Sequence, residues 1–292
     1  MSSPSPSPEP RVTVSVAHFF ADIDLDPERR TQTAYIVIDV IRATTTLAVM
    51  FERGARRVLV ARDVEAARRV RDSLPGAIVA GEINAVAPPD FDHGNSPDEW
   101  GGLDVSGKEI LFSTTNGARA LHAAMGGGPV FAGSLRNASA VCAAALEASS
   151  RLATPTVGGF ITIVCSGRDD RPAEDDSLCA GWLVQTLQRE AAEGGLPVTL
   201  GAGAQQALDL LDAQRTAHAE ARNWLYDALA ASEPARDVLD VGLGADLAWC
   251  AEVDASANVP MVAGEDIARA LVVIEEAPPD VSSTALPAVG IG

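Results

Sequence analysis

The segment YIVIDVIRATTT, residues 35 to 46, places a carboxylate, a guanidinium and three hydroxyls directly after an apolar run. Such a β-branched run is typical of a buried strand, and open α/β sheets bind ligands at the carboxyl ends of their strands. The carboxylate of Asp39 suits a hard cation such as Mg²⁺, whereas Arg42 suits phosphate or carboxylate oxygens. A plainer interpretation is that Asp39 and Arg42 form a local ion pair and the threonines begin a helix.

A second polar cluster follows the apolar run EILFS. It consists of Ser113, Thr114, Thr115, Asn116 and Gly117. Hydroxyls and free backbone N–H groups at the start of a helix bind anions, Gly117 permits close approach, and Arg119 adds positive charge in the first turn. Helix capping explains one Thr or Asn but not the whole run with an arginine. We therefore expect an anion site here.

Two further turns carry polar side chains. The run GAIVAGE ends at Glu82 and is followed by a long loop, INAVAPPDFDHGNSPDEW, that contains Asn95. A long loop costs conformational entropy unless something orders it, which favours a functional role over a purely structural one. The turn FAGSLRNASA supplies Ser134 and Arg136, and we interpret Asn137 as a helix N-cap.

Acidic residues gather in IVCSGRDDRPAEDDSLCAG. They are Asp169, Asp170, Glu174, Asp175 and Asp176. Solvated charge in the first turn of a helix is the simpler interpretation. Two carboxylates about 4 Å apart, however, repel by roughly 4 kcal/mol at an effective dielectric of 20, so any two that converge in a pocket call for a cation. The same segment matches the CxxxxxR spacing of cysteine phosphatases from Cys165 to Arg171, but its two aspartates would repel a phosphate dianion.

The composition is that of a globular protein. Of the 292 residues 47% are hydrophobic, and no apolar run reaches the roughly 18 residues of a membrane span. A net charge of −18 argues against nucleic acid as a partner. We expect a cytoplasmic protein with no membrane partner, because residues 1–10 lack the features of a secretory signal. The four cysteines show no CxxC pair, so we expect small core residues.

Strand and helix patterns alternate along the first two thirds of the chain, which predicts an α/β fold with a largely parallel sheet and flanking helices. Strands are expected at 11–19, 34–40, 56–61, 76–82, 109–113, 129–133 and 160–166, and helices at 43–55, 63–74, 116–125 and 137–148. A C-terminal helical elaboration is expected at about 177–235, followed by late strands at 260–264 and 270–277. We predict one domain over 11–275, a disordered tail at 1–10 and a flexible tail at 276–292.

Taken in order, these motifs resemble the 2-phosphosulfolactate phosphatase family from about residue 12 to residue 264. The matching motifs are DVIRATTT, GE at residues 81 and 82, FDHGNSP, STTNGARAL, GSLRNASA, VCSGR and EDDSLCAG. The resemblance implies an α/β, magnesium-dependent acid phosphatase that hydrolyses 2-phospho-3-sulfolactate to 3-sulfolactate and phosphate, a step toward coenzyme M. The motif DxDx(T/V) of the haloacid dehalogenase phosphatases is absent. Arg136 departs from the family pattern, which has an apolar residue there.

The resemblance also implies roles for individual residues. It implies catalytic roles for Asp39, Arg42 and Arg119, substrate binding by Thr114, Thr115, Asn116, Gly117, Asn95 and Ser134, and binding of Mg²⁺ by Asp39, Glu82, Asp175 and Asp176. Either water or a side chain such as Asp39 attacks phosphorus, and either Asp175 or Asp176 faces the metal. The partner is then a small anionic phosphate ester, and a homo-oligomer stays open. The alternatives are a phosphatase for other 2-hydroxy acid phosphates and a non-catalytic binder of organic anions.

Overall fold

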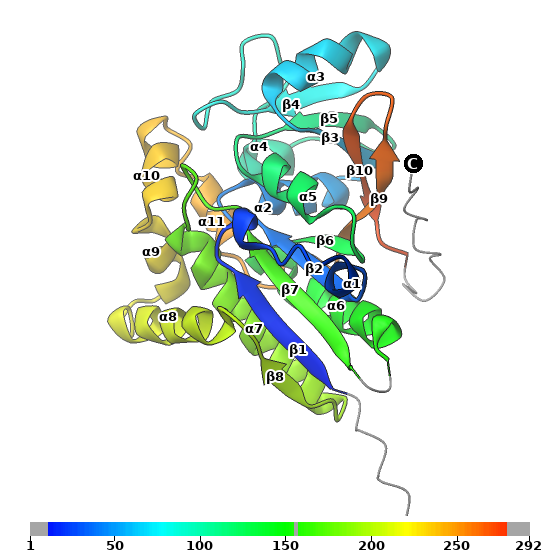
Figure 1. Cartoon of the computed structure of the whole chain (residues 1–292). Coiled ribbons are helices and arrows are strands. Elements are labelled where there is room, and N and C mark those ends of the chain that lie inside the picture. The colour runs from blue at the N-terminus through cyan, green and yellow to red at the C-terminus, as the bar shows by residue number, and fades with distance from the viewer. Residues whose placement is uncertain (1–10, 155–156, 279–292) are drawn as a thin grey trace, which may run out of the picture.

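The computed structural model describes residues 11–154 and 157–278, which form one ten-stranded sheet with helices around it (Figure 1). The strands are β1 (Val12–Ala17), β2 (Thr33–Ile38), β3 (Arg57–Ala61), β4 (Ile78–Gly81), β5 (Glu109–Ser113), β6 (Val130–Gly133), β7 (Gly159–Cys165), β8 (Val198–Leu200), β9 (Pro260–Asp266) and β10 (Leu271–Glu276). The helices are α1 (Pro27–Thr31), α2 (Ala43–Glu52), α3 (Val64–Val70), α4 (Pro97–Gly101), α5 (Gly117–Ala124), α6 (Ala138–Leu152), α7 (Glu174–Glu193), α8 (Ala204–Ala217), α9 (Trp224–Ala230), α10 (Glu233–Asp240) and α11 (Asp246–Cys250). The α/β class is confirmed.

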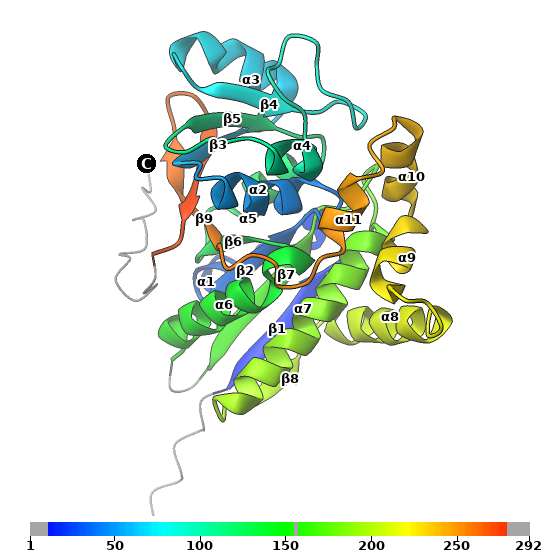
Figure 2. The ribbon, with the colours of Figure 1, turned by 180° about the vertical axis from the view of Figure 1, so that it is seen from behind.

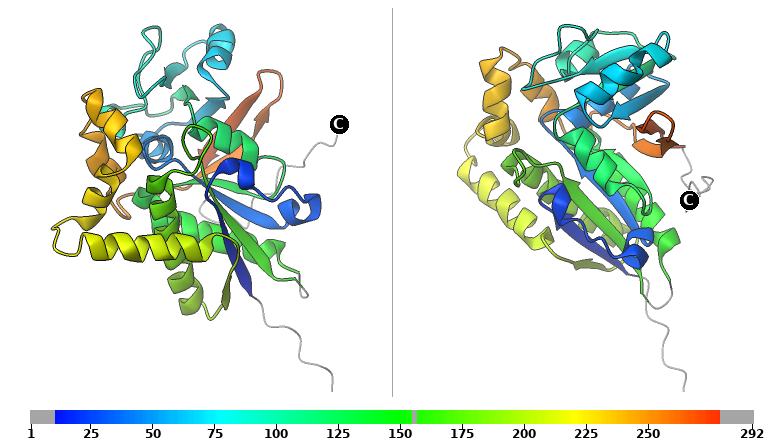
Figure 3. Two further views of the ribbon diagram at one scale, coloured as in Figure 1. Left: turned by 60° about the vertical axis from the view of Figure 1, so that its left-hand side comes forward. Right: turned by 45° about the horizontal axis from the view of Figure 1, so that its top comes forward.

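The sheet consists of two parallel blocks joined by an antiparallel hairpin, so the largely parallel sheet is also confirmed. Its order is β4-β5-β3-β10-β9-β6-β2-β7-β1-β8, and β9 and β10 pair antiparallel with each other and with their outer neighbours. In a flat sheet these three antiparallel steps would send the carboxyl ends of the two blocks to opposite edges. Adjacent strands rotate by about 20–25°, so the five steps from β5 to β2 amount to roughly 100–125°. The blocks accordingly cross at a large angle (Figures 1 and 3).

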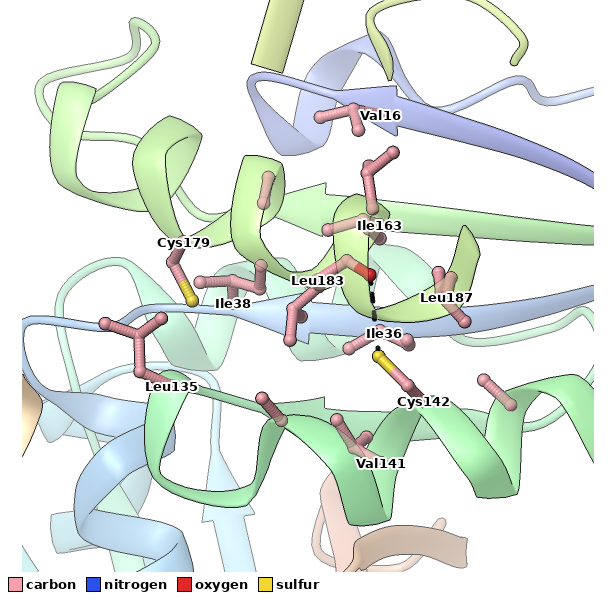
Figure 4. Close-up of a cluster of buried hydrophobic side chains, with 14 of the residues drawn as sticks. Val16, Ile36, Ile38, Leu135, Val141, Cys142, Ile163, Cys179, Leu183 and Leu187 are labelled. Atoms are coloured by element: carbon pink, nitrogen blue, oxygen red, sulfur yellow. Dashed lines mark hydrogen bonds between the residues drawn. The ribbon is translucent and has the colours of Figure 1, made fainter. Parts of the chain in front are cut away.

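The central strand β2 is buried along its whole length, which explains why its sequence is continuously apolar. Its side chains alternate between two cores. Ile36 and Ile38 pack with residues of α6 and α7, which cover one face of the sheet (Figures 2 and 4). Tyr35 and Val37 pack with residues of α2 and α5. The strand is therefore fixed on both faces, and the residues that follow it have a defined position.

The helical region that follows β7 is longer than the predicted 177–235. It begins with α7 at Glu174, continues through α11 to Cys250, and includes the short strand β8. β8 was not predicted because its three residues are too few for a recognisable strand pattern, and it forms by pairing with β1. The late hairpin agrees with the strands expected at 260–264 and 270–277.

The predicted tails fall mostly beyond the part of the chain that the structure describes. Residues 1–10 and 279–292 lie outside it, and Glu276 belongs to β10. Within residues 11–154 and 157–278, no helix combines the length and apolarity that crossing a membrane requires. All four cysteines are buried and free, which confirms them as core residues. Figure 4 shows one of them, Cys142, with its thiol 3.6 Å from the carbonyl oxygen of Leu183.

Candidate active site

A polar cavity of about 130 Å³ lies where the ends of four strands and two helices meet. Its lining includes Asp39 and Arg42 after β2, Glu82 and Asn95 after β4, Thr115 and Asn116 after β5, Ser166 to Asp169 after β7, Asp175 and Asp176 of α7, and Pro234, Asp237 and Val238 of α10. The strands β4 and β5 come from one parallel block, and β2 and β7 come from the other. The twist of the sheet thus brings the carboxyl ends of both blocks to one cavity.

Asp39 lies at the end of β2 and is buried. The backbone N–H of Ala43, in the first turn of α2, donates to its Oδ1 at 3.2 Å. Gly117 packs so closely on the carboxylate that an added Cβ would lie 2.7 Å from Oδ2. Burial, together with the negative charges of Asp176 and Glu82, raises the pKa of Asp39 to about 7, and hydrogen bonds from the backbone N–H groups of Ala43 and Gly117 oppose this rise. Glycine at position 117 therefore leaves the space that the carboxylate of Asp39 occupies.

The two consecutive aspartates of α7 differ in what their oxygens contact. Asp176 accepts hydrogen bonds from the N–H of Val40 at 3.0 Å, the N–H of Gly167 at 3.0 Å and the hydroxyl of Ser166 at 2.9 Å. In contrast, Oδ1 of Asp175 is buried without a hydrogen-bond partner among the described residues. Burial raises the pKa of Asp176 to about 6 and that of Asp175 well above its usual range. Asp175 therefore has a carboxylate oxygen that is free to bind a ligand, whereas both oxygens of Asp176 already accept hydrogen bonds.

Glu82 connects two loops at the cavity. Its carboxylate accepts the N–H of Ala85 at 2.9 Å and the N–H of Thr115 at 2.7 Å. The side chain of Asn95 is also buried, and its Oδ1 has no partner within the described part of the chain. A buried polar atom without a partner is rare in native proteins and marks a place for a ligand, a water or an ion.

The guanidinium of Arg42 lines the cavity but is already paired. Its Nη1 lies 2.7 Å from Oδ2 of Asp246 in α11, and its Nη2 donates to the carbonyl of Ala85 at 2.7 Å. Asp246 also accepts the hydroxyl of Ser96 at 2.5 Å. The plainer interpretation, a local ion pair between Asp39 and Arg42, is therefore wrong, because the partner of Arg42 is a carboxylate 204 positions along the chain.

The structure places Arg119 and Thr114 beside the cavity rather than in its lining. The guanidinium of Arg119 is 41% exposed, pairs with Asp170 at 2.9 Å and stacks over the ring of Phe20. The hydroxyl of Thr114 accepts the N–H of Ala118 at 3.1 Å, which is helix capping. Both residues line a neighbouring pocket that shares Glu82 and Thr115 with the cavity.

The turn after β6 lies away from the cavity. Ser134 is fully buried, and its backbone N–H and hydroxyl both donate to Oδ1 of Asn137, at 2.9 and 3.1 Å. Arg136 pairs with Glu52 and Glu252. The expected substrate-binding role of Ser134 is not supported, since its hydroxyl is used within its own turn. Glu174 is likewise outside the lining and accepts a hydrogen bond from Gln214.

Arg168 is a candidate site residue that the sequence reasoning missed. It lines the cavity, and its Nη1 is buried with no hydrogen-bond partner among the residues described. The signal was present, because Arg168 ends the motif VCSGR directly after β7. The CxxxxxR interpretation of the same segment fails, because burial raises the pKa of Cys165 well above that of an ordinary thiol and the sulfur is inaccessible.

Comparison with known proteins places this chain in a family. A family model described as 2-phosphosulpholactate phosphatase matches residues 22–265. The chain is 35% identical over 247 residues to a probable 2-phosphosulfolactate phosphatase of Deinococcus radiodurans, an alignment that covers 84% of this chain and 94% of the relative. It is 36% identical over 234 residues to a protein of the same description in Thermus thermophilus, covering 78% and 87%. The motif-based prediction is confirmed, and the chain belongs to the 2-phosphosulfolactate phosphatase family.

Proposed function

We propose that this protein is a magnesium-dependent phosphatase that hydrolyses 2-phospho-3-sulfolactate to 3-sulfolactate and phosphate, a reaction of the coenzyme M pathway. The observation that supports it is the convergence of buried carboxylates, an amide and a guanidinium on one cavity at the strand ends. The names of the relatives supply the substrate. The hydrolysis of phosphate monoesters is slow without a catalyst, so several groups must act together.

Two carboxylates fit the proposed Mg²⁺. Asp39 and Asp175 are both buried, and the negative charge of Asp39 adds to burial in raising the pKa of Asp175. Oδ1 of Asp175 has no partner in the described ranges. Glu82 and Asp176 instead accept backbone N–H groups, and no set of three acidic, His or Cys side chains among the described residues forms a metal site. Mg²⁺ commonly uses one or two carboxylates and takes its other ligands from water and substrate phosphate. When bound, it supplies a Lewis acid that offsets the negative charge of phosphate oxygens.

The remaining residues of the cavity bind and orient the ester. The side chains of Thr115 and Asn116, at the start of α5, offer a hydroxyl and an amide where a helix N-terminus favours an anion. Asn95 adds a buried amide from the long loop. Glu82 holds the turn at Thr115 in place, because its carboxylate accepts a hydrogen bond from the backbone N–H of Thr115. The cavity thereby offers the phosphate hydrogen-bond donors from the start of α5 and from the long loop.

Phosphate release from 2-phospho-3-sulfolactate tests the proposed function. The purified protein is expected to release phosphate in Mg²⁺ and to lose that activity in excess EDTA, with recovery when Mg²⁺ is restored. Other 2-hydroxy acid phosphates in the same assay define the range of substrates. Equilibrium binding of the ester without any phosphate release would instead identify a non-catalytic anion-binding protein, and full activity in EDTA would remove the metal from the proposal.

The raised carboxylate pKa values predict how the metal-free protein responds to pH. Because the pKa of Asp39 rises from 3.8 in the unfolded chain to about 7 in the fold, the folded protein holds an extra proton between these values. The contribution of protonated Asp39 to stability is present at pH 4 and is lost as the pH rises through 7. The melting temperature in EDTA is therefore expected to fall between pH 5 and pH 8, and Mg²⁺ is expected to restore it at pH 8. Melting curves that are the same with EDTA and Mg²⁺ at pH 8 would contradict this.

A further inference from the structure

Positive charge in the cavity is scarce, although the proposed substrate carries several negative charges. Among the lining residues in the described ranges, only Arg42 and Arg168 are permanently cationic. Arg42 is paired with the fully buried Asp246 and with a backbone carbonyl. A buried pair of this kind has little capacity to attract another anion, since its charges already offset each other. The cation available to a ligand is therefore Arg168.

The guanidinium of Arg168 is only partly satisfied. Its Nη2 lies 2.7 Å from Oδ2 of Asp237 in α10, and its Nε donates to the carboxylate of Asp169 at 3.2 Å. Its Nη1 is buried and has no partner in the part of the chain that the structure describes. Asp237 also lines the cavity. Its carboxylate therefore contacts Arg168 from within the lining, where the acid group of a ligand could take its place. Guanidinium groups bind carboxylates and related oxyanions through two parallel hydrogen bonds.

We propose that Arg168 is a specificity-determining residue that binds the carboxylate or sulfonate of the substrate, and that Asp237 is its counter-ion when no substrate is bound. This inference rests on the proposed function and names the substrate class as phosphate monoesters with an additional acid group nearby. The acid group contacts Nη1 and displaces Asp237 from Nη2. Arg168 thereby selects for acidic esters, while the phosphate itself is bound by Thr115 and Asn116 after β5 and by the Mg²⁺ ion that Asp39 and Asp175 would hold.

The neighbouring Arg171 is a matched control. It lies on the same turn as Arg168 and also pairs with α10, through Glu233 at 2.6 Å, but both side chains are about half exposed and neither lines the cavity. If the arginines serve only to pack the turn against α10, Arg168→Gln and Arg171→Gln should have similar effects. If Arg168 binds substrate, only Arg168→Gln should change substrate affinity.

The test compares two esters that differ in the acid group, 2-phospholactate and isopropyl phosphate, in Mg²⁺ buffer. A hydrogen bond to a charged group contributes about 1.5–3 kcal/mol, which corresponds to roughly 10- to 100-fold in affinity. Arg168→Gln is expected to raise KM for 2-phospholactate by that factor and to leave KM for isopropyl phosphate near the wild-type value. Arg171→Gln should change neither. Asp237→Asn should lower KM for 2-phospholactate severalfold, whereas Glu233→Gln should not.

Several results would overturn the inference. They are equal KM changes for the two esters in Arg168→Gln, equal effects of Arg168→Gln and Arg171→Gln, and a raised KM in Asp237→Asn. If Arg168→Gln does not fold, Arg168→Lys replaces it, and an unchanged KM for 2-phospholactate in that variant counts against the role because Lys lacks the planar donor pair.

Calorimetric binding of 3-sulfolactate separates this inference from the proposed function, because it requires no turnover. Should the wild-type protein hydrolyse no ester, the phosphatase proposal fails. A loss of roughly 10- to 100-fold in 3-sulfolactate affinity in Arg168→Gln but not in Arg171→Gln would still support Arg168 as the acid-binding residue. Equal affinities in the wild type and both variants would overturn that role.

Discussion

Replacing Asp39 by Asn is expected to lower kcat/KM by at least about 10³-fold while the fold is kept. The amide has nearly the same shape and keeps an oxygen for the N–H of Ala43, but it cannot carry the charge that a cation or a phosphoryl transfer requires. The same change removes a buried negative charge beside Asp175 and Asp176. The free energy of unfolding in EDTA at pH 8 is therefore expected to rise, by on the order of 2 kcal/mol.

Steady-state kinetics and urea unfolding of the same preparation measure both effects. Asp170→Asn is the matched control, because its carboxylate is largely exposed and pairs with Arg119 outside the cavity lining. It should change neither turnover nor stability appreciably. Near-normal turnover in Asp39→Asn would remove Asp39 from the site, and lower stability would show that its buried charge is compensated in the metal-free protein.

The second large effect is expected at Asp246. Asp246→Ala leaves the guanidinium of Arg42 buried without its counter-ion. It also removes the carboxylate that accepts a hydrogen bond from the hydroxyl of Ser96. The loss of one partner from a buried ion pair costs about 3–5 kcal/mol, and we expect a decrease of that size in the free energy of unfolding from urea titrations. Activity should fall as well, because Arg42 and the loop that carries Asn95 lose their shared partner.

A double replacement distinguishes charge from packing at this position. Arg42→Met with Asp246→Leu removes both charges and keeps apolar volume, so it should recover much of the stability that Asp246→Ala loses. Glu233→Gln provides a surface comparison, since the ion pair of Glu233 is exposed and its urea midpoint should remain close to that of the wild type. A stable Asp246→Ala protein would mean that water or another group solvates Arg42, and would contradict the assigned pair.

The local part of the site could be predicted from the sequence. The buried run that ends at Asp39 predicts a strand delivering polar groups to a sheet edge, and the structure places Asp39 at the end of β2 in the cavity lining. The same reasoning predicts Glu82, which directly follows β4, and Thr115 and Asn116, which lie just after the end of β5. In these cases the position of the side chain depends mainly on the strand before it.

Partners distant along the chain could not be predicted. Nothing near Arg42 indicates that its carboxylate partner is Asp246, and nothing near Arg168 indicates that α10 supplies Asp237. Ser134 was chosen because its turn resembles the others, yet β6 ends away from the cavity and its hydroxyl is used by Asn137. Periodicity reports which residues are buried but does not report which turns meet in three dimensions.

The arrangement of the sheet was also beyond the sequence patterns. Alternating strands and helices predict parallel pairing, which holds within each block, but not the hairpin β9–β10 that joins the blocks. That hairpin and the accumulated twist decide that Glu82 of one block and Asp39 of the other line the same cavity.

A crystal structure of the protein with Mn²⁺ in place of Mg²⁺ and with bound 3-sulfolactate tests the central claim most directly. The account predicts an anomalous manganese peak contacting the carboxylates of Asp39 and Asp175, with an acid group of 3-sulfolactate on Nη1 of Arg168. A metal ion and ligand bound elsewhere, with this cavity holding only water, would contradict it.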